Sequence, residues 1–262
     1  IGGGSVAAHT YAGASRALVQ LGADLIAWLY LFDDAHGEQG DEAAFAAAVS
    51  VARGEALPFG ASPFLRALAD LGRRAAVRAG AGWRARFAAA LEFFFDGCRR
   101  EGPYRASGQA PGLVAYREVK LRSVGAAPVF ALLQLESGLA AGEAGGAALT
   151  ALERDAAFLC AWVNDVFSYE KERAAGDPLN LVHVLAVERG LDPAAAFDAA
   201  AALYREDHAR LVAGAAAFLD DPARSEAERR YVRGVMTWVR GNLAWTVTSG
   251  RYAAATGHAR AA

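Results

Sequence analysis

Hydrophobic residues recur at three- and four-residue steps along most of the chain, a spacing that predicts helices. The segment 15–34 is apolar most of the way round, which indicates a buried helix that ends near Gly37. Asp41 follows as the expected N-terminal cap of a second helix. Residues 82–102 form a longer helical pattern, and one of its faces gathers apolar side chains: Phe87, Leu91, Phe94, Phe95 and Cys98.

Glycine and proline mark the breaks between these patterns. The stretch 103–112 contains two prolines and two glycines and is predicted to be a loop. Gly125 and Pro128 interrupt the helical pattern that follows, which predicts a kink or a short break there. The longest helical pattern covers 146–176, and three more follow it. We therefore expect an all-α fold of about eight to ten helices, forming a single domain over residues 1–262.

Composition agrees with a helical, globular chain. Hydrophobic residues make up 54% and charged residues 21%, and alanine is abundant while β-branched residues are sparse. The formal net charge of −2 provides no strong field for nucleic acid or an anionic membrane, so we expect neither partner. No apolar run reaches the ~18 residues of a membrane-spanning helix. Two cysteines, Cys98 and Cys160, form no disulfide framework, which indicates a reducing, cytoplasmic location with both thiols in the core.

One polar face on the longest helical pattern points to metal chemistry. Asn164, Ser168 and Glu172 are four residues apart. Each step of four turns a helix by about 400°, so the three side chains drift by only ~40° per step and share a face. Amide, hydroxyl and carboxylate oxygens are hard ligands that suit Mg²⁺, whereas zinc or copper would favour thiolate and imidazole. The competing interpretation is an ordinary solvated helix face.

A second acidic cluster lies at the end of the first buried helix. Asp33, Asp34 and Glu38 leave an apolar segment where the helix dipole is negative, and a bound cation would relieve the repulsion. The competing interpretation is a solvated helix terminus. His36 lies between the acidic residues, and we expect it to face solvent.

These two clusters resemble the motifs of the bacterial class I terpene synthases. "DDAHGE" is similar to the aspartate-rich motif in its DDxxxE form, and "NDVFSYEKE" matches the NDxxSxxxE motif in full. "GDPLNLV" follows, as a similar segment does in many members, and "WTVTSGRY" resembles the C-terminal Trp and Arg-Tyr pair. "YREVKLRSVGAAP" resembles the kinked helix that carries a diphosphate-sensing arginine. The resemblance spans Trp28 to Tyr252; a lone DDxxxE is weak evidence, but the combination is very specific.

The resemblance implies an all-α bundle around a deep apolar pocket, with three Mg²⁺ ions at its mouth. It also implies an isoprenyl diphosphate as the substrate and allows a homodimer. Members of the family usually have a further N-terminal segment, and only 32 residues precede Asp33 here, so we expect that a segment is missing.

The resemblance also assigns roles to individual residues. Asp33, with Asp34 or Glu38, would hold one or two Mg²⁺ ions, and the Asn164, Ser168 and Glu172 set would hold another. Residues that would contact the diphosphate are Arg122, Lys171, Arg251 and Tyr252, with Lys120 as the alternative to Arg122. Asp165 is expected to make a structural hydrogen bond or salt bridge, because it points about 100° away from Asn164.

Aromatic side chains would line the pocket and stabilise a carbocation. The candidates are Phe32, Phe94, Phe95, Trp162, Phe167 and Trp245, although ordinary core packing is the competing interpretation for each. The predicted function is a Mg²⁺-dependent terpene cyclase, with farnesyl diphosphate favoured by its frequency in the family. The first alternative is a chain-elongating prenyltransferase, which would instead carry a second DDxxD motif. The second is a non-catalytic helical binding protein, in which Asn164, Ser168 and Glu172 would bind no metal.

Overall fold

The computed structural model describes residues 2–37, 39–79, 82–139 and 146–249. They form eleven α-helices and one π-helical turn, η1, so the all-α prediction is confirmed. No helix within these ranges is long and apolar enough to cross a membrane. The elements are α1 (Gly3–Thr10), α2 (Arg16–Phe32), η1 (Asp33–Gly37), α3 (Glu42–Arg53), α4 (Pro63–Ala76), α5 (Trp83–Ser107), α6 (Leu113–Ser123), α7 (Ala126–Ser137), α8 (Ala147–Ala175), α9 (Leu181–Arg189), α10 (Pro193–Asp220) and α11 (Glu226–Thr248).

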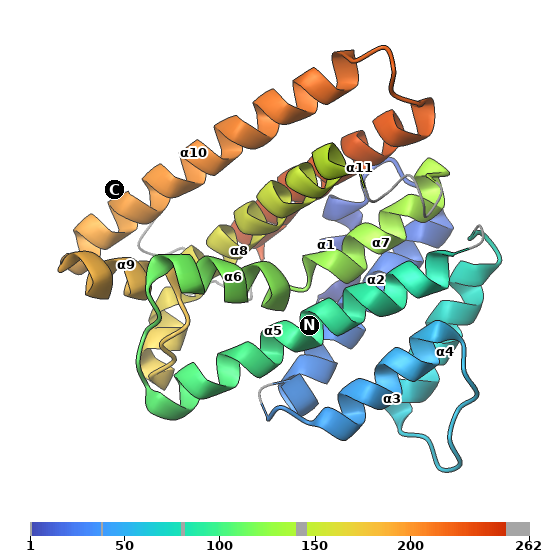
Figure 1. Ribbon diagram of the computed structural model, residues 1–262, viewed down its shortest axis with the longest axis horizontal. Coiled ribbons are helices and arrows are strands. Elements are labelled where there is room, and N and C mark those ends of the chain that lie inside the picture. The colour runs from blue at the N-terminus through green and yellow to red at the C-terminus, as the bar shows by residue number, and fades with distance from the viewer. Residues whose placement is uncertain (1, 38, 80–81, 140–145, 250–262) are drawn as a thin grey trace.

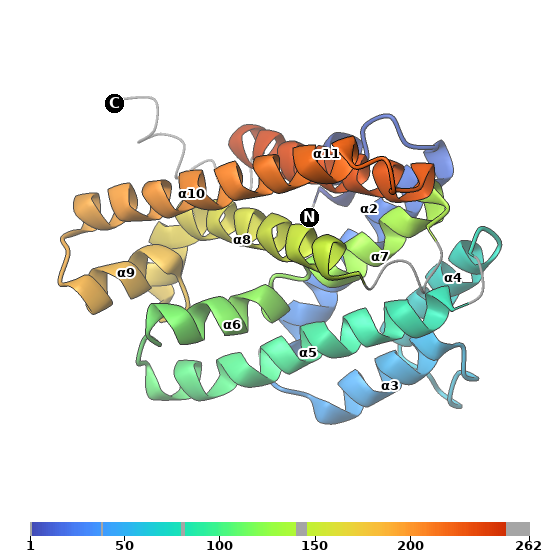
Figure 2. The same ribbon diagram turned by 45° about the horizontal axis from the view of Figure 1, so that its top comes forward.

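The long helices lie roughly along one direction and pack side by side. Figures 1 and 2 show α8, α10 and α11 along one side of the molecule and α3, α5 and α6 along the other, with α2 and α7 between them. Contacts of α7 with α5, α8 and α11, and of α6 with α8, join these groups. The longest helix, α8, also contacts α6, α7, α9 and α11, so its side chains are surrounded on several sides.

Buried apolar residues fall into two clusters. The larger one joins α1 to α5 with α7, α11 and the first half of α8. The smaller one lies where α6, α8, α9 and α10 meet, around the aromatic rings of Tyr116, Phe158 and Trp162. Cys98 and Cys160 are both buried thiols in the larger cluster, as predicted.

Glycine sets the path of the chain beside the polar motifs. A methyl group at Gly97 of α5 would collide with the backbone at Ser123, so α5 and α6 meet through their main chains there. Gly125, with φ +72°, separates α6 from α7 at the predicted break. Gly176, also with φ +72°, ends α8 as expected. Only glycine adopts this left-handed conformation at low cost.

One local prediction was wrong. Residues 103–107 continue α5 rather than form a loop, with Pro103 inside the helix. Arg105 holds these last turns through ion pairs to Glu101 at 2.8 Å and Asp177 at 3.2 Å, contacts that local propensity does not register. The glycine-rich N-terminus forms α1, because α1 packs so closely on α11 that a methyl group at Gly241 would collide with the backbone of His9.

Candidate active site

The aspartate-rich motif forms the π-helical turn η1 at the end of α2. Asp33 is half-buried and Asp34 is exposed, while Glu38 lies outside the described residues. The Cys98 thiol of α5 donates to Asp33 Oδ1 at 3.7 Å, a sulfur hydrogen bond. A methyl group at Gly37 would collide with the same oxygen. The Asp33 carboxylate is therefore folded back over Gly37 and directed by α5.

The prediction that His36 faces solvent is wrong, because its ring packs against aromatic side chains. Its ring lies 4.9 Å from the Phe32 ring and 5.3 Å from the Phe64 ring, centroid to centroid. Its Nδ1 lies 2.9 Å from Asp41 Oδ2, the cap of α3. The π-helical turn widens the last turn of α2 and brings the imidazole over these aromatic neighbours, which an α-helical projection of the sequence does not show.

The second motif lies on the last three turns of α8. Ser168 is buried, and its Oγ donates to the backbone carbonyl oxygen of Asn164 at 2.7 Å. The two residues are one turn apart on the continuous helix α8 and therefore lie on the same face. Glu172 is half-buried, and its Oε2 accepts a hydrogen bond from Asn180 Nδ2 at 2.7 Å. Because the Ser168 proton is committed to the helix backbone, the hydroxyl lone pairs are left to accept or to bind a cation.

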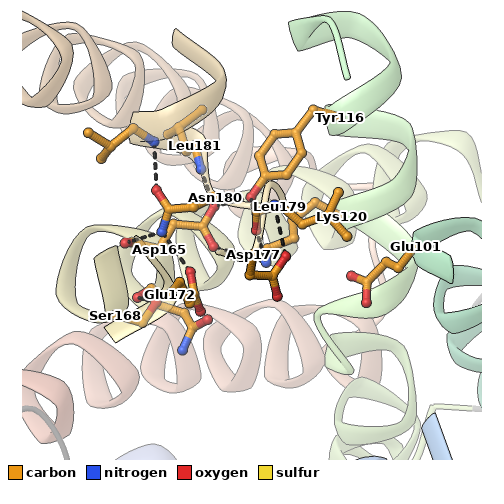
Figure 3. A network of polar contacts seen from close by, with 12 residues as sticks. Glu101, Tyr116, Lys120, Asp165, Ser168, Glu172, Asp177, Leu179, Asn180 and Leu181 are labelled. Atoms are coloured by element: carbon orange, nitrogen blue, oxygen red, sulfur yellow. Dashed lines mark hydrogen bonds and ion pairs between the residues drawn. The ribbon is translucent and has the colours of Figure 1, made fainter. Parts of the chain in front are cut away.

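Asp165 has the structural role that was predicted. Its side chain is fully buried, and its carboxylate lies 3.0 Å from Lys120 Nζ, accepts the Leu181 backbone N–H at 3.1 Å and accepts the Tyr116 hydroxyl (Figure 3). Burial raises the pKa of Asp165 to about 6, although the Lys120 ammonium acts to lower it. Asp165 is thus ionised at neutral pH and ties α6 and the start of α9 to α8.

The cations assigned to diphosphate binding have different surroundings. Lys171 is exposed beside Glu172 on α8. Arg122 Nε pairs with Asp96 Oδ2 of α5 at 2.9 Å, and its Nη1 donates to the backbone of its own helix. Lys120, the alternative sensor, is committed to Asp165, so Arg122 remains the better candidate. Arg251 and Tyr252 lie outside the described residues.

The aromatic candidates separate into two groups. The Phe95 ring stacks on Phe45 of α3 at 4.5 Å and lies 5.4 Å from Phe32, so Phe32 and Phe95 pack between α2, α3 and α5. Trp162 belongs to the smaller cluster, where its indole N–H donates to Asp207 Oδ2 of α10 at 2.7 Å. All three thus pack in the core, and their assignment as pocket lining stays a prediction. Core burial and pocket lining both call for apolar residues at helical spacing, so the spacing alone does not separate them.

Three other aromatic residues belong to the larger cluster or pack against it. Phe94 of α5 is buried and lies within ordinary contact distance of a methyl group at Gly125, as does Leu29 of α2. Trp245 of α11 is buried in the larger cluster, and Phe167 of α8 packs against that cluster. Phe94, Phe167 and Trp245 therefore stay candidate lining residues.

Helices α5 and α6 connect the two acidic motifs. On α5, Cys98 contacts Asp33 and Asp96 holds Arg122. On α6, Lys120 contacts Asp165, the neighbour of Asn164 in the second motif. The side chains that link the motifs thus come from two helices packed at Gly97, close to the break at Gly125.

The donor set fits a hard divalent cation. Asn164, Ser168 and Glu172 contribute an amide, a hydroxyl and a single carboxylate from one face, all of them oxygen ligands. Among the described residues, no group of three or more His, Cys, Asp or Glu side chains is suited to a metal. The residues present therefore match Mg²⁺ better than zinc.

Three residues that matter here were missed at first. Asn180 directs Glu172, and its one sequence signal is its place directly before an apolar helix, typical of an N-terminal cap. Cys98 was assigned only to the core, yet it also contacts Asp33. Gly37 was interpreted as a helix end, but its missing side chain makes room for the Asp33 carboxylate.

Comparison with known proteins decides the family. The model of terpene synthase family 2, C-terminal metal binding, matches residues 24–210. A curated relative, the (2E,6E)-farnesyl diphosphate cyclizing (+)-T-muurolol synthase of Roseiflexus castenholzii, is 33% identical over 260 residues, which cover 95% of this chain and 80% of the relative. The chain belongs to the bacterial class I terpene synthase family. The protein is thus a terpene cyclase, a lyase with a divalent metal-binding domain, and its terpene synthase homologues bind an isoprenyl diphosphate.

Further relatives agree with this assignment. The 10-epi-cubebol synthase of Sorangium cellulosum is 28% identical over 261 residues, covering 95% of this chain and 82% of the relative. A linalool/nerolidol synthase from Streptomyces clavuligerus, solved in complex with 2-fluorogeranyl diphosphate, superimposes with a TM-score of 0.84. That alignment covers 93% of this enzyme and 87% of the solved chain at 22% identity, and it shows the shared fold.

Proposed function

We propose that this enzyme cyclises farnesyl diphosphate in a Mg²⁺-dependent reaction. The observation that carries the proposal is the arrangement of Asn164, Ser168 and Glu172 on α8, where hydrogen bonds fix the hydroxyl and the carboxylate. The farnesyl diphosphate named for the T-muurolol synthase relative supports the choice of substrate. Asp33 and Asp34, with Glu38, would provide the opposing ligands.

The diphosphate end of the substrate needs positive charge. Mg²⁺ held by these oxygens would neutralise the diphosphate and make it a better leaving group. Lys171 and Arg122, with Arg251 and Tyr252, would donate hydrogen bonds to its oxygens. Cleavage of the bond between the substrate's C1 and oxygen leaves the electron pair on diphosphate and an allylic cation on the hydrocarbon. Arg122 would exchange Asp96 for the diphosphate, since its Nε now pairs with that carboxylate.

The hydrocarbon end needs a dry, aromatic enclosure. Phe94, which lies beside the break at Gly125, would line it together with Phe167 and Trp245, and their ring faces would stabilise positive charge as the chain cyclises. Exclusion of water protects the cation until a proton leaves to give a hydrocarbon, or until one water is captured to give an alcohol. This reaction requires no protein nucleophile, because the carbocation is itself the reactive species.

The test is product analysis with the three common substrate lengths. Purified protein is incubated with geranyl, farnesyl or geranylgeranyl diphosphate, with Mg²⁺ or with a chelator, and the extracts are analysed by gas chromatography–mass spectrometry. We expect a fifteen-carbon product from farnesyl diphosphate only when Mg²⁺ is present. A folded protein that yields no product from any of the three substrates would contradict the proposal.

A further inference from the structure

Asn180 lies where the chain returns from the end of α8 to the start of α9. Its side chain is 1% exposed, and its Oδ1 accepts the Val182 backbone N–H at 2.9 Å, which caps α9. An asparagine at a helix N-terminus ordinarily needs only this bond. The two hydrogens of its amide group are free to serve another purpose.

Both of these hydrogens are directed back to α8. Asn180 Nδ2 lies 2.7 Å from the Asp165 carbonyl oxygen and 2.7 Å from Glu172 Oε2 (Figure 3). One amide group therefore contacts the helix at the middle of the motif and the carboxylate at its end. Because the carbonyl contact fixes the direction of the amide, the second N–H points to one position, which the Glu172 carboxylate occupies.

The segment that carries Asn180 is itself held firmly. Asp165 accepts the Leu181 backbone N–H at 3.1 Å, and the Tyr116 hydroxyl contacts both Asp165 and the Leu179 carbonyl, the latter at 3.2 Å. The residues on each side of Asn180 are thus bound to the buried Asp165 cluster. The amide has little freedom to follow Glu172 if that carboxylate turns, so Glu172 must follow the amide.

We propose that Asn180 is a positioning residue for metal binding, which holds Glu172 Oε2 so that the carboxylate presents its other oxygen toward the face shared with Asn164 and Ser168. This inference rests on the proposed role of Glu172 as a ligand. A glutamate has three side-chain torsions, and fixing them before the cation arrives removes an entropic cost from binding. Residues that orient metal ligands typically change metal affinity about 10–100-fold when mutated.

Two substitutions separate this role from helix capping. Asn180→Ser keeps a good capping residue but is too short to reach Glu172, and Asn180→Asp keeps the capping oxygen but has no N–H to donate. Asp192→Ser at the cap of α10, where Asp192 accepts the Ala195 N–H at 2.9 Å, is the matched control for a changed cap.

The experiment measures Mg²⁺ affinity by calorimetry in the presence of inorganic diphosphate, with the Mg²⁺ concentration for half-maximal turnover as a second readout. We expect wild type and Asp192→Ser to agree, and both Asn180 variants to bind about 10–100-fold more weakly. In a Glu172→Gln background, Asn180→Ser should cause no further loss, because it acts through Glu172.

The outcomes distinguish this inference from the proposed function. If wild type binds Mg²⁺ and a folded Asn180→Ser binds it equally well, Asn180 has no positioning role while the function stands. An additive loss in the Glu172→Gln background would also overturn the inference, since a general structural effect would not depend on Glu172. If wild type shows no Mg²⁺-dependent binding or turnover, the metal assignment falls and the inference falls with it.

Discussion

Lys120 of α6 forms a buried ion pair with Asp165 of α8, in which the ammonium nitrogen lies 3.0 Å from the carboxylate. Burial acts to lower the pKa of Lys120, but Asp165 and Glu101 outweigh it and raise that pKa above its usual range. The pair is therefore charged at neutral pH. The chain's other lysine, Lys171, is exposed on α8, so the two lysines serve different purposes.

Removal of each lysine should separate folding from catalysis. We expect Lys120→Met to lower the free energy of unfolding by about 3–5 kcal/mol, because it leaves a buried carboxylate unpaired. Lys171→Met should change that free energy by no more than about 0.5 kcal/mol. It should instead reduce turnover about 10–100-fold, the effect of one lost hydrogen bond to a charged group. Urea denaturation and steady-state kinetics provide the two measurements, and equal stability losses would contradict this assignment.

Gly37 should be required for activity and not for folding. Gly37→Ala places a methyl group where Asp33 Oδ1 now lies, and the carboxylate can rotate away at little cost to the fold. We expect thermal unfolding to stay close to wild type while the Mg²⁺ concentration for half-maximal turnover rises about 10–100-fold. Gly102→Ala in α5 is the matched control, because a methyl group there meets nothing within 4 Å. If the two variants need the same Mg²⁺ concentration for half-maximal turnover, the position of the Asp33 carboxylate does not matter for Mg²⁺ binding, and the prediction is wrong.

Asp207 should make the fold sensitive to acid. Burial alone would raise its pKa, but the Trp162 indole, Arg210 and Arg117 outweigh burial and lower it. A carboxyl whose pKa is lower in the folded state stabilises the protein above its unfolded pKa of about 4, and that stability is lost as pH falls through the folded value. Acid unfolding monitored by circular dichroism should therefore report the Trp162 hydrogen bond directly.

Trp162→Phe removes that donor and leaves an aromatic ring. We expect a loss of about 1.5–3 kcal/mol at pH 7 and a higher pH midpoint of acid unfolding. Trp28→Phe is the control, since its indole donates at 2.9 Å to the uncharged carbonyl of Phe64 and should lower stability without changing the pH dependence. Parallel pH profiles for the two variants would disprove the link to Asp207.

The helix cap, the helix break and the polar face of α8 could be predicted because each depends on residues that are close together in the sequence. Asp41 caps α3 by accepting the Ala44 N–H at 3.1 Å, and the break at Gly125 follows from a backbone angle that glycine favours. The shared face of Asn164 and Ser168 follows from four-residue spacing on the unbroken helix α8. Each of these features depends on residues within one or two turns of one another.

The missed features depend on residues far apart in the sequence. The contact between Cys98 and Asp33 joins residues 65 positions apart, and the Trp162 contact to Asp207 spans 45 positions. Apolar spacing shows that a residue of α8 is buried, but α8 contacts helices on several sides, so spacing does not show which neighbour a ring meets. Asn180 was missed for a similar reason, because its second set of hydrogen bonds appears only when the chain folds back on α8.

The most direct test of the central claim measures diphosphate release from farnesyl diphosphate as Mg²⁺ is titrated, in wild type and in Glu172→Gln. The substitution keeps the size of the side chain and removes the negative charge. We predict saturable, Mg²⁺-dependent release by wild type and a large loss in Glu172→Gln, with both proteins folded. Equal release by the two proteins, or release by wild type that is independent of Mg²⁺, would contradict the account.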